Sequence, residues 1–314
     1  MDDDAIAALP PGVLLARDGA AAGMGCDALR RAVGSGQLVR VRSGAYVRST
    51  EWASARPETR HRMAVDAVSR QLAAPVFCHE SAAAVWGLPL VRADDGVHVL
   101  GPAGADGSRA GLGTRAGVTR HAARPDLRVV DRDGLRVTSP VDTVLAVAAS
   151  RDLRRSLPVA DAAVRAGLVT REDLVRGAAA RERTRGVRRM RVVAQLADGR
   201  AESAGESVSR ARIHLDGFAQ PDLQVPFVRR GEVVARVDFW WAGPRVVGEF
   251  DGRKKYRVDG VDDRRALEDR LWDEKRREDR LRDAGLRVVR WTWQDAWRPG
   301  PLAALLRSAS VPRA

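Results

Sequence analysis

The stretch RVDFWWAGPRVVGEFDG, residues 236–252, decides the fold of the C-terminal third of this chain. Two runs rich in valine and aromatic residues, at 233–241 and 245–250, are separated by a short segment with glycine and proline. Such runs are typical of β-strands, and a short turn between them favours an antiparallel pair. Another strand-like run at 223–228 comes before them, so the sequence predicts a three-stranded meander.

Helices and one further strand are expected around this meander. Residues 201–217 have the spacing of a helix that ends at a glycine, and residues 266–285 form a second, highly charged helical pattern that also ends at a glycine. Residues 286–293 then return as a fourth strand, before a last helix that runs through Leu305. The predicted order within the C-terminal domain, residues 197–314, is helix, three strands, helix, strand, helix.

Acidic side chains lie at the ends of two predicted strands. Glu249 and Asp251 are two residues apart, so both carboxylates project from the same face of one strand. Asp238 ends the preceding strand, and an antiparallel neighbour can deliver it to the same end of the sheet. Glu206 shares a helix face with Glu202 and can lean over this cluster. Neighbouring carboxylates favour a cation, and an oxygen-only set suits Mg²⁺ or Mn²⁺.

This pattern can support hydrolysis of a phosphodiester bond. Such a site needs a metal that polarises the phosphate, an activated water, and a cation near the developing charge. The predicted metal ligands are Glu206, Asp238, Glu249 and Asp251, and the predicted catalytic set is Asp238, Glu249, Asp251, Lys254 and Lys255. The alternative interpretation is a solvated strand end whose acids pair with nearby arginines.

The phrases RVDFWW and GEFDG, followed by EKRREDRLRDAGLRVVRWTW at 274–293, resemble the very-short-patch-repair type of domain within the PD-(D/E)XK endonuclease superfamily. The resemblance covers the C-terminal third and implies a restriction-endonuclease-like α/β domain with a mixed sheet. It also implies metal-dependent DNA hydrolysis, with a helix acid, an acid on one strand and an acid pair on the next strand holding the metal. By motif position these acids are Glu206, Asp238, Glu249 and Asp251.

The chain departs from the superfamily pattern at one position. Asp251 stands where the motif places a lysine after the second acid. An ammonium group for catalysis would then have to come from Lys254, Lys255 or Lys275. The departure is common to the short-patch-repair-like branch, so the resemblance predicts the fold more firmly than the activity.

The N-terminal domain, residues 1–50, contains the phrase CDALRRAVGSGQLVRVRSGAYV at 26–47. A short helix followed by two strands around a Ser-Gly turn is typical of a winged helix. The part QLVRVRSGAYV, at 37–47, is similar to the winged-helix domain of AbiEi-type antitoxins, the repressor halves of type IV toxin–antitoxin systems. That resemblance implies DNA binding, through the recognition-helix and wing residues Arg30, Arg31, Arg40 and Arg42. The alternative is a half-buried hairpin with its polar face in water.

The middle domain, residues 51–196, is expected to mix helices and strands. Residues 61–73 have helical spacing, residues 96–100 and 127–130 are strand-like, and a capped helix is expected within 139–150. No catalytic pattern is present in this part. The predicted fold class is therefore a multi-domain α+β and α/β protein.

Composition favours a polyanionic partner. The net charge is +13, and 45% of the residues are apolar, which is enough for folded cores. Most of the cationic excess is arginine, a bias that a GC-rich genome also produces. Cys26 and Cys78 are predicted to be buried and lack CxxC spacing, and the five histidines show no i, i+4 pairing, so the sequence predicts neither a disulfide nor a zinc site. A cytoplasmic protein without a signal peptide or membrane segment is expected.

Two functions are compatible with these features. The first is a DNA-binding protein with a Mg²⁺- or Mn²⁺-dependent endonuclease domain. The second is an AbiEi-like antitoxin or transcriptional repressor that binds its toxin-gene operator and carries an inactive nuclease-like domain. The acidic cluster favours the first, whereas the wing and the missing motif lysine favour the second.

Overall fold

The structure, a computed structural model, describes residues 11–21, 23–92, 96–101, 113–182, 184–229, 232–252, 272, 281 and 283–314. Lys254, Lys255 and Lys275, the predicted sources of a catalytic ammonium, lie outside the described residues. The predicted charged helix at 266–285 also lies largely outside them.

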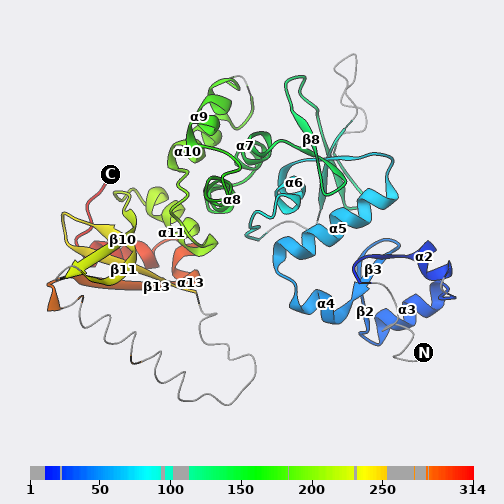
Figure 1. The fold of residues 1–314 in the computed structure, drawn as a ribbon, viewed down its shortest axis with the longest axis horizontal. Coiled ribbons are helices and arrows are strands. Elements are labelled where there is room, and N and C mark those ends of the chain that lie inside the picture. Colours follow the sequence, from blue (N-terminus) through cyan, green and yellow to red (C-terminus); the bar gives the residue numbers. More distant parts are fainter. Residues whose placement is uncertain are drawn as a thin grey trace. The chain divides into compact units, whose positions relative to one another are not determined.

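The chain divides into two compact units, which we call the first unit and the second unit (Figure 1). The first unit comprises Met1–Arg151 and Glu172–Ala194, and the second comprises Asp152–Arg171 and Gln195–Ala314. The sequence suggested boundaries near residues 50 and 196. The contacts instead group residues 152–171 with the C-terminal segment, because helix α8 (Leu153–Arg165) packs against helix α11 (Ala204–Leu215).

The N-terminal part of the first unit has two helices and a small antiparallel sheet. Its elements are β1 (Leu14–Leu15), α2 (Ala16–Ala21), α3 (Cys26–Gly34), β2 (Leu38–Arg42) and β3 (Ala45–Arg48). The strand order is β1-β3-β2, and the tight turn between β2 and β3 uses Gly44 with a φ of 70°. Leu14, Leu29 and Leu38 are buried between the helices and the sheet. The predicted helix and hairpin are therefore present.

The rest of the first unit contains a six-stranded mixed sheet, with the order β6-β7-β5-β4-β9-β8. The strands are β4 (Val76–Phe77), β5 (Val97–Leu100), β6 (Gly113–Arg115), β7 (Val118–His121), β8 (Val129–Arg132) and β9 (Leu135–Thr138). The helices are α4 (Ser49–Ser54), α5 (Pro57–Gln71), α6 (His79–Val85), α7 (Pro140–Ser150), α9 (Arg171–Ala179) and α10 (Val187–Leu196).

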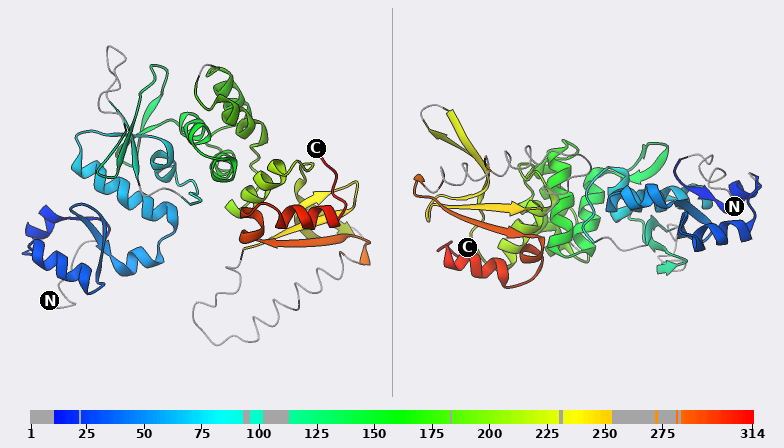
Figure 2. Two further views of the ribbon diagram at one scale, coloured as in Figure 1. Left: turned by 180° about the vertical axis from the view of Figure 1, so that it is seen from behind. Right: turned by 90° about the horizontal axis from the view of Figure 1, so that it is seen from below.

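Hydrophobic packing explains why this sheet forms where it does. Val65 and Val68 of α5 are fully buried against Phe77 and Val99 of the central strands. Figure 2 shows the ribbon of the chain in two further views. The expected capped helix is present as α7, which begins at Pro140 rather than after it, and its N-cap Ser139 accepts a hydrogen bond from the Asp142 amide.

The second unit is built on a four-stranded sheet with the order β10-β11-β12-β13. Its strands are β10 (Asp222–Arg229), β11 (Glu232–Trp241), β12 (Val246–Asp251) and β13 (Arg287–Thr292), and its remaining helices are α13 (Trp293–Trp297) and α14 (Pro301–Ser308). The first three strands are antiparallel, and β13 runs parallel to β12. The predicted meander and the returning fourth strand are confirmed.

Close packing fixes helix α11 against the strand that carries the acidic residues. A Cβ atom added at Gly248 would lie 2.4 Å from the Trp291 ring, and one at Gly205 would lie 2.0 Å from the Phe250 ring. The Trp291 indole N–H donates a 2.7 Å hydrogen bond to the Ser209 hydroxyl on α11. Both glycines are therefore required by the small separation between backbone and aromatic rings, and this separation sets the height of α11 above β12.

The chain is thus a mixed α/β protein with several sheets, as the sequence predicted at that level. Among the described residues, no helix combines the length and the apolar character that are needed to cross a membrane.

Candidate functional site

Asp238 and Glu249 lie at the end of the paired part of β11 and β12 in the second unit. The antiparallel pairing ends at Phe239 and Gly248, and Asp238 and Glu249 are the next residues along the two strands. The Asp238 carboxylate also accepts a 3.0 Å hydrogen bond from the Phe250 amide. This contact holds the Asp238 side chain against β12.

Glu206 reaches the same place from helix α11. It occupies the third position of the helix, where its carboxylate accepts hydrogen bonds from the Ser203 hydroxyl at 2.7 Å and the Glu202 amide at 2.9 Å. The Gln224 amide nitrogen donates to Glu206 at 3.0 Å and to Asp238 at 3.4 Å. A single side-chain amide therefore connects the helix acid to the strand acid.

The electrostatics of Glu206 reflect this crowding. Burial raises the pKa of the Glu206 carboxyl, and the Asp238 carboxylate raises it further, against the lowering effect of the hydrogen bonds. A positive ion at this point would relieve the repulsion between the two acids. The Glu206 carboxylate also has a structural interpretation, because it accepts hydrogen bonds from Glu202 and Ser203 at the start of α11, where Ser203 is the N-cap.

Asp251 and Arg290 complete the row of charged residues. Glu249 is buried and pairs in register with Arg290 of the parallel strand β13, whereas the half-buried Asp251 pairs with Thr292 at the end of β12. Asp251 therefore lies one strand-repeat beyond the Asp238–Glu249 pair. Within the described ranges, the acids of this row do not form a group of three whose oxygen atoms all lie within 4.8 Å of one another.

The four arginines predicted to bind DNA differ in exposure. Arg30 and Arg31 on α3 and Arg40 on β2 are exposed, and Arg30 forms a 3.1 Å ion pair with Asp27. Arg42 is half-buried and donates a 3.2 Å hydrogen bond to the Ala116 carbonyl, and burial lowers the pKa of its guanidinium. Three of the four are accessible to a nucleic acid, whereas Arg42 is engaged within the first unit.

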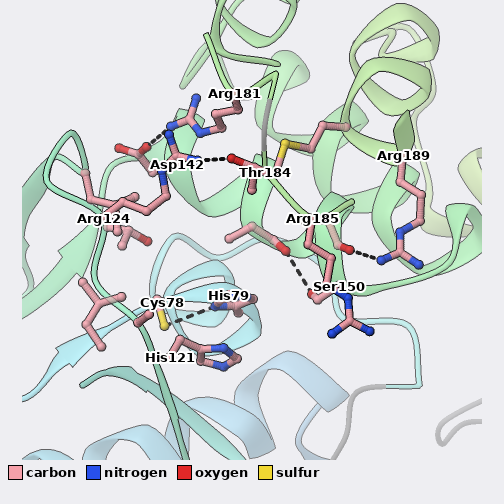
Figure 3. A pocket seen from close by; sticks show the side chains of 17 residues that line it. Cys78, His79, His121, Arg124, Asp142, Ser150, Arg181, Thr184, Arg185 and Arg189 are labelled. Carbon is pink, nitrogen blue, oxygen red and sulfur yellow. Dashed lines mark hydrogen bonds and ion pairs between the residues drawn. The ribbon is translucent and has the colours of Figure 1, made fainter. Parts of the chain in front are cut away.

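A cluster of histidines in the first unit contradicts the sequence-based view that they are scattered. Cys78, His79 and His121 place one possible ligand atom each within 4.8 Å of the others. The His79 and His121 rings stack with their centroids 3.8 Å apart (Figure 3). The His98 Nδ1 lies 2.8 Å from the His121 Nε2. The sequence predicted no zinc site, and that prediction is wrong in one respect, because a thiol and two imidazoles do lie close enough together to hold a metal ion. Cys26 is also exposed rather than buried.

Topology explains the convergence. Cys78 and His79 follow strand β4, His98 lies in β5, and His121 ends β7, and these three strands are neighbours in the sheet. In the sequence, the only signal is a polar residue at or just after each of three apolar runs. Without the strand order, that signal does not show that the residues meet.

The cluster is buried and chemically unusual. Burial raises the pKa of the Cys78 thiol, and the Glu80 charge raises it further. Burial and the neighbouring His121 hold the pKa of His79 well below 6.5, and burial with the neighbouring His98 lowers the pKa of His121 to about 4. Both imidazoles are therefore neutral at neutral pH. Neutral histidine is the form that binds metals.

A cavity of about 640 Å³ lies beside this cluster. Cys78, His79 and His121 line one part of it, and the arginines that line it are Arg124, Arg181, Arg185 and Arg189. Among the described residues of the lining, Asp142 is the single carboxylate, and it is already paired with the buried guanidinium of Arg181. The lining is therefore positively charged overall, which favours an anionic ligand.

Fold and geometry together define a two-unit α/β protein that has an acidic row in one unit and a thiol–imidazole cluster in the other. No protein-family model matches the chain. Two Mycobacterium tuberculosis proteins, named Uncharacterized protein Rv2248 (strain H37Rv) and Uncharacterized protein MT2308 (strain CDC 1551), are each 32% identical to it over 219 residues. The alignment covers 70% of this chain and 75% of each relative. The chain belongs to the family of these mycobacterial proteins.

Proposed function

We propose that this protein binds DNA and hydrolyses phosphodiester bonds with a divalent metal ion held by the acidic row. The observation that carries the proposal is the contact between Glu206 and Asp238 through Gln224, with Asp238 and Glu249 directly after the last paired residues of β11 and β12. The three carboxylates come from one helix and two neighbouring strands of a mixed sheet. The residues fit Mg²⁺ or Mn²⁺, because all the donors are oxygen atoms.

Each acid has a separate part in this proposal. Asp238 and Glu249 are the central ligands, and Glu206 and Asp251 flank them. When bound, the metal would polarise a phosphate oxygen and lower the pKa of a water molecule. Gln224 positions two of the carboxylates through its amide nitrogen.

The N-terminal part of the first unit supplies the DNA-binding half of the proposal. Two helices followed by a hairpin, with the strand order β1-β3-β2, support a winged helix in which α3 is the recognition helix. Arg30 and Arg31 on this helix and Arg40 on the wing are exposed. Guanidinium groups at these positions suit contacts with phosphates and with guanine edges.

Cleavage of plasmid DNA and of mismatched duplexes, under a titration of Mg²⁺ and Mn²⁺, tests the proposal. We expect Asp238→Asn and Glu249→Gln to abolish cleavage while circular dichroism and thermal unfolding show an intact fold. Asp222→Asn is the matched control, because Asp222 is an exposed acid on the same sheet and lies outside the row. Cleavage that persists in both row variants, or that falls equally in the control, would contradict the assignment.

A second function is favoured by the arginine beside the row. Arg290 is in register with Glu249, and the Glu206 carboxylate accepts hydrogen bonds from Glu202 and Ser203, so these acids have structural partners without a metal. In this case the protein is an antitoxin-like repressor that binds a toxin-gene operator through its wing and does not cleave DNA. A promoter-shift assay that compares Arg40→Ala with a control variant tests this second function. The control is Arg307→Ala, which removes another exposed arginine. Equal affinity of the two variants would remove the wing from this function.

A further inference from the structure

Outside the acidic row, the strongest chemical feature of the described residues is the cluster at the end of β4, β5 and β7. It brings together one sulfur and two imidazole groups, from Cys78, His79 and His121. Thiolate and imidazole are the preferred ligands of zinc and related transition metals, in contrast to the oxygen ligands that Mg²⁺ prefers. The cluster and the acidic row therefore belong to different classes of metal chemistry.

The residues behind the cluster resemble the support of a metal site. His98 Nδ1 is 2.8 Å from His121 Nε2, and its other ring nitrogen lies 3.6 Å from the Glu80 carboxylate. Glu80 in turn forms a buried ion pair with Arg151. Metal-bound histidines commonly use their second ring nitrogen in such a contact, which fixes the ring orientation. The chain of contacts from Glu80 through His98 to His121 fixes the orientation of the His121 ring within the cluster.

The backbone at His79 is also unusual. Its φ is 50°, in the left-handed region that residues with a side chain rarely adopt. This conformation places the His79 ring against the His121 ring at 3.8 Å, with its Nδ1 at 3.2 Å from the Cys78 sulfur. Strained backbone of this kind is often found at functional sites, where the surrounding structure holds it in place.

We propose that Cys78, His79 and His121 bind one zinc-class transition-metal ion, and that the adjoining cavity takes a phosphate-bearing ligand. Three protein ligands leave a coordination position for water or substrate, as in catalytic zinc sites. All three ligands line the cavity, which also carries Arg124, Arg181, Arg185 and Arg189. This site lies in the first unit and does not depend on the proposed nuclease function of the second unit.

The cavity lining supports an anion rather than a neutral ligand. Two of its arginines have strong internal partners, since Arg181 pairs with Asp142 and Arg124 binds Asp126 at 3.0 Å. Arg185 is exposed at the edge of the same cavity. A guanidinium group and a metal ion near one another can both contact the oxygen atoms of a phosphate.

Cobalt(II) titration of the full chain tests the metal site, because cobalt in a zinc site gives visible bands and a thiolate charge-transfer band. We expect one equivalent to bind, with the charge-transfer band lost in Cys78→Ser and kept in the matched control Cys26→Ser, whose thiol is exposed. His121→Gln should weaken binding at least about tenfold. The absence of cobalt and zinc binding by the wild-type chain, or a charge-transfer band that survives in Cys78→Ser, would overturn the proposal.

Thermal unfolding is a second measurement of metal binding, because a substitution that impairs folding would also remove the cobalt bands. Zinc should raise the midpoint of unfolding of the wild-type chain and of Cys26→Ser, because a ligand that binds the native state stabilises it. The rise should be clearly smaller for His121→Gln, because its zinc site is weaker. An equal rise in all three proteins would show that zinc binds elsewhere, and it would overturn the site.

Inorganic phosphate is the probe for the anion. Its addition to the cobalt-loaded chain should shift the visible bands, and Arg185→Ala should raise the phosphate concentration required. The matched control is Arg188→Ala, which removes an exposed arginine three residues further along the chain, at the start of α10 and outside the cavity lining. Unchanged bands at high phosphate, or equal effects of the two variants, would overturn the ligand part of the proposal.

Discussion

Replacing Gly248 with alanine tests the close packing on which the acidic row depends. The new methyl carbon would lie 2.4 Å and 2.8 Å from two atoms of the Trp291 ring and 3.1 Å from the Cβ atom of Phe239. The Trp291 ring is 1% exposed, and its N–H is held by Ser209, so the ring has little freedom to move away. Strand β12 or helix α11 must therefore shift.

Two effects of opposite sign determine how much Gly248→Ala changes the free energy of unfolding. Removing a glycine from a strand lowers the entropy of the unfolded chain and stabilises the protein by about 0.5–1 kcal/mol. Overfilling a tightly packed core costs about 1–3 kcal/mol. The overfilling dominates because the contact is with a fixed ring, so we expect Gly248→Ala to lower the free energy of unfolding by about 1–2 kcal/mol.

Urea denaturation followed by tryptophan fluorescence measures this change, with Gly243→Ala as the matched control. An added Cβ at Gly243 meets no atom within 4 Å, so the control should be neutral or slightly stabilising. The double variant Gly248→Ala/Trp291→Phe removes the ring atoms that clash, and its stability should exceed the sum of the single effects by about 0.5–3 kcal/mol. A Gly248→Ala protein as stable as the control would refute the packing argument.

Three further predictions concern other parts of the fold. Arg210→Met leaves the fully buried Asp161 without its 2.7 Å ion pair and should cost about 3–5 kcal/mol in urea denaturation at pH 7, and less at low pH. Ser139→Ala removes the cap of α7 and should cost about 1 kcal/mol by the same method, and no loss would contradict the capping role. In metal-free protein, the lowered pKa of His121 should make stability fall as the pH drops from 6.5 to about 4, because the unfolded state binds the proton first. A thermal midpoint that is independent of pH in this range would refute that reading.

The second unit could be predicted largely from the sequence because its signals are local. Alternating apolar runs gave the meander at 223–250, and the two-residue spacing placed Glu249 and Asp251 on the same strand. Asp238 lies near the other acids of the row because a short turn makes β11 and β12 antiparallel neighbours, as the sequence also indicates. The position of Glu206 depends in addition on the packing of α11, so the bridge through Gln224 could not be foreseen.

The histidine cluster could not be predicted because its members meet only through the order of the strands. His98 and His121 are separated by 22 intervening residues in the sequence, yet they lie on parallel neighbours with His121 paired to Leu100. A search for i, i+4 spacing examines helices and closely spaced ligands, and it does not detect ligands contributed by different strands. The same limit applies to Arg42, whose partner Ala116 is far away in the sequence.

The two proposed metal sites prefer different classes of metal ion, so experiments can distinguish one site from the other. The acidic row offers only oxygen ligands, whereas the cluster in the first unit offers sulfur and nitrogen. A hard ion such as Mg²⁺ favours the first set, and a borderline ion such as zinc favours the second. Asp238→Asn should therefore abolish Mg²⁺-dependent cleavage and leave the cobalt charge-transfer band intact. Cys78→Ser should abolish the charge-transfer band and leave Mg²⁺-dependent cleavage intact. Loss of both signals in either variant would mean that one metal serves a single function, or that the variant has unfolded, which circular dichroism distinguishes.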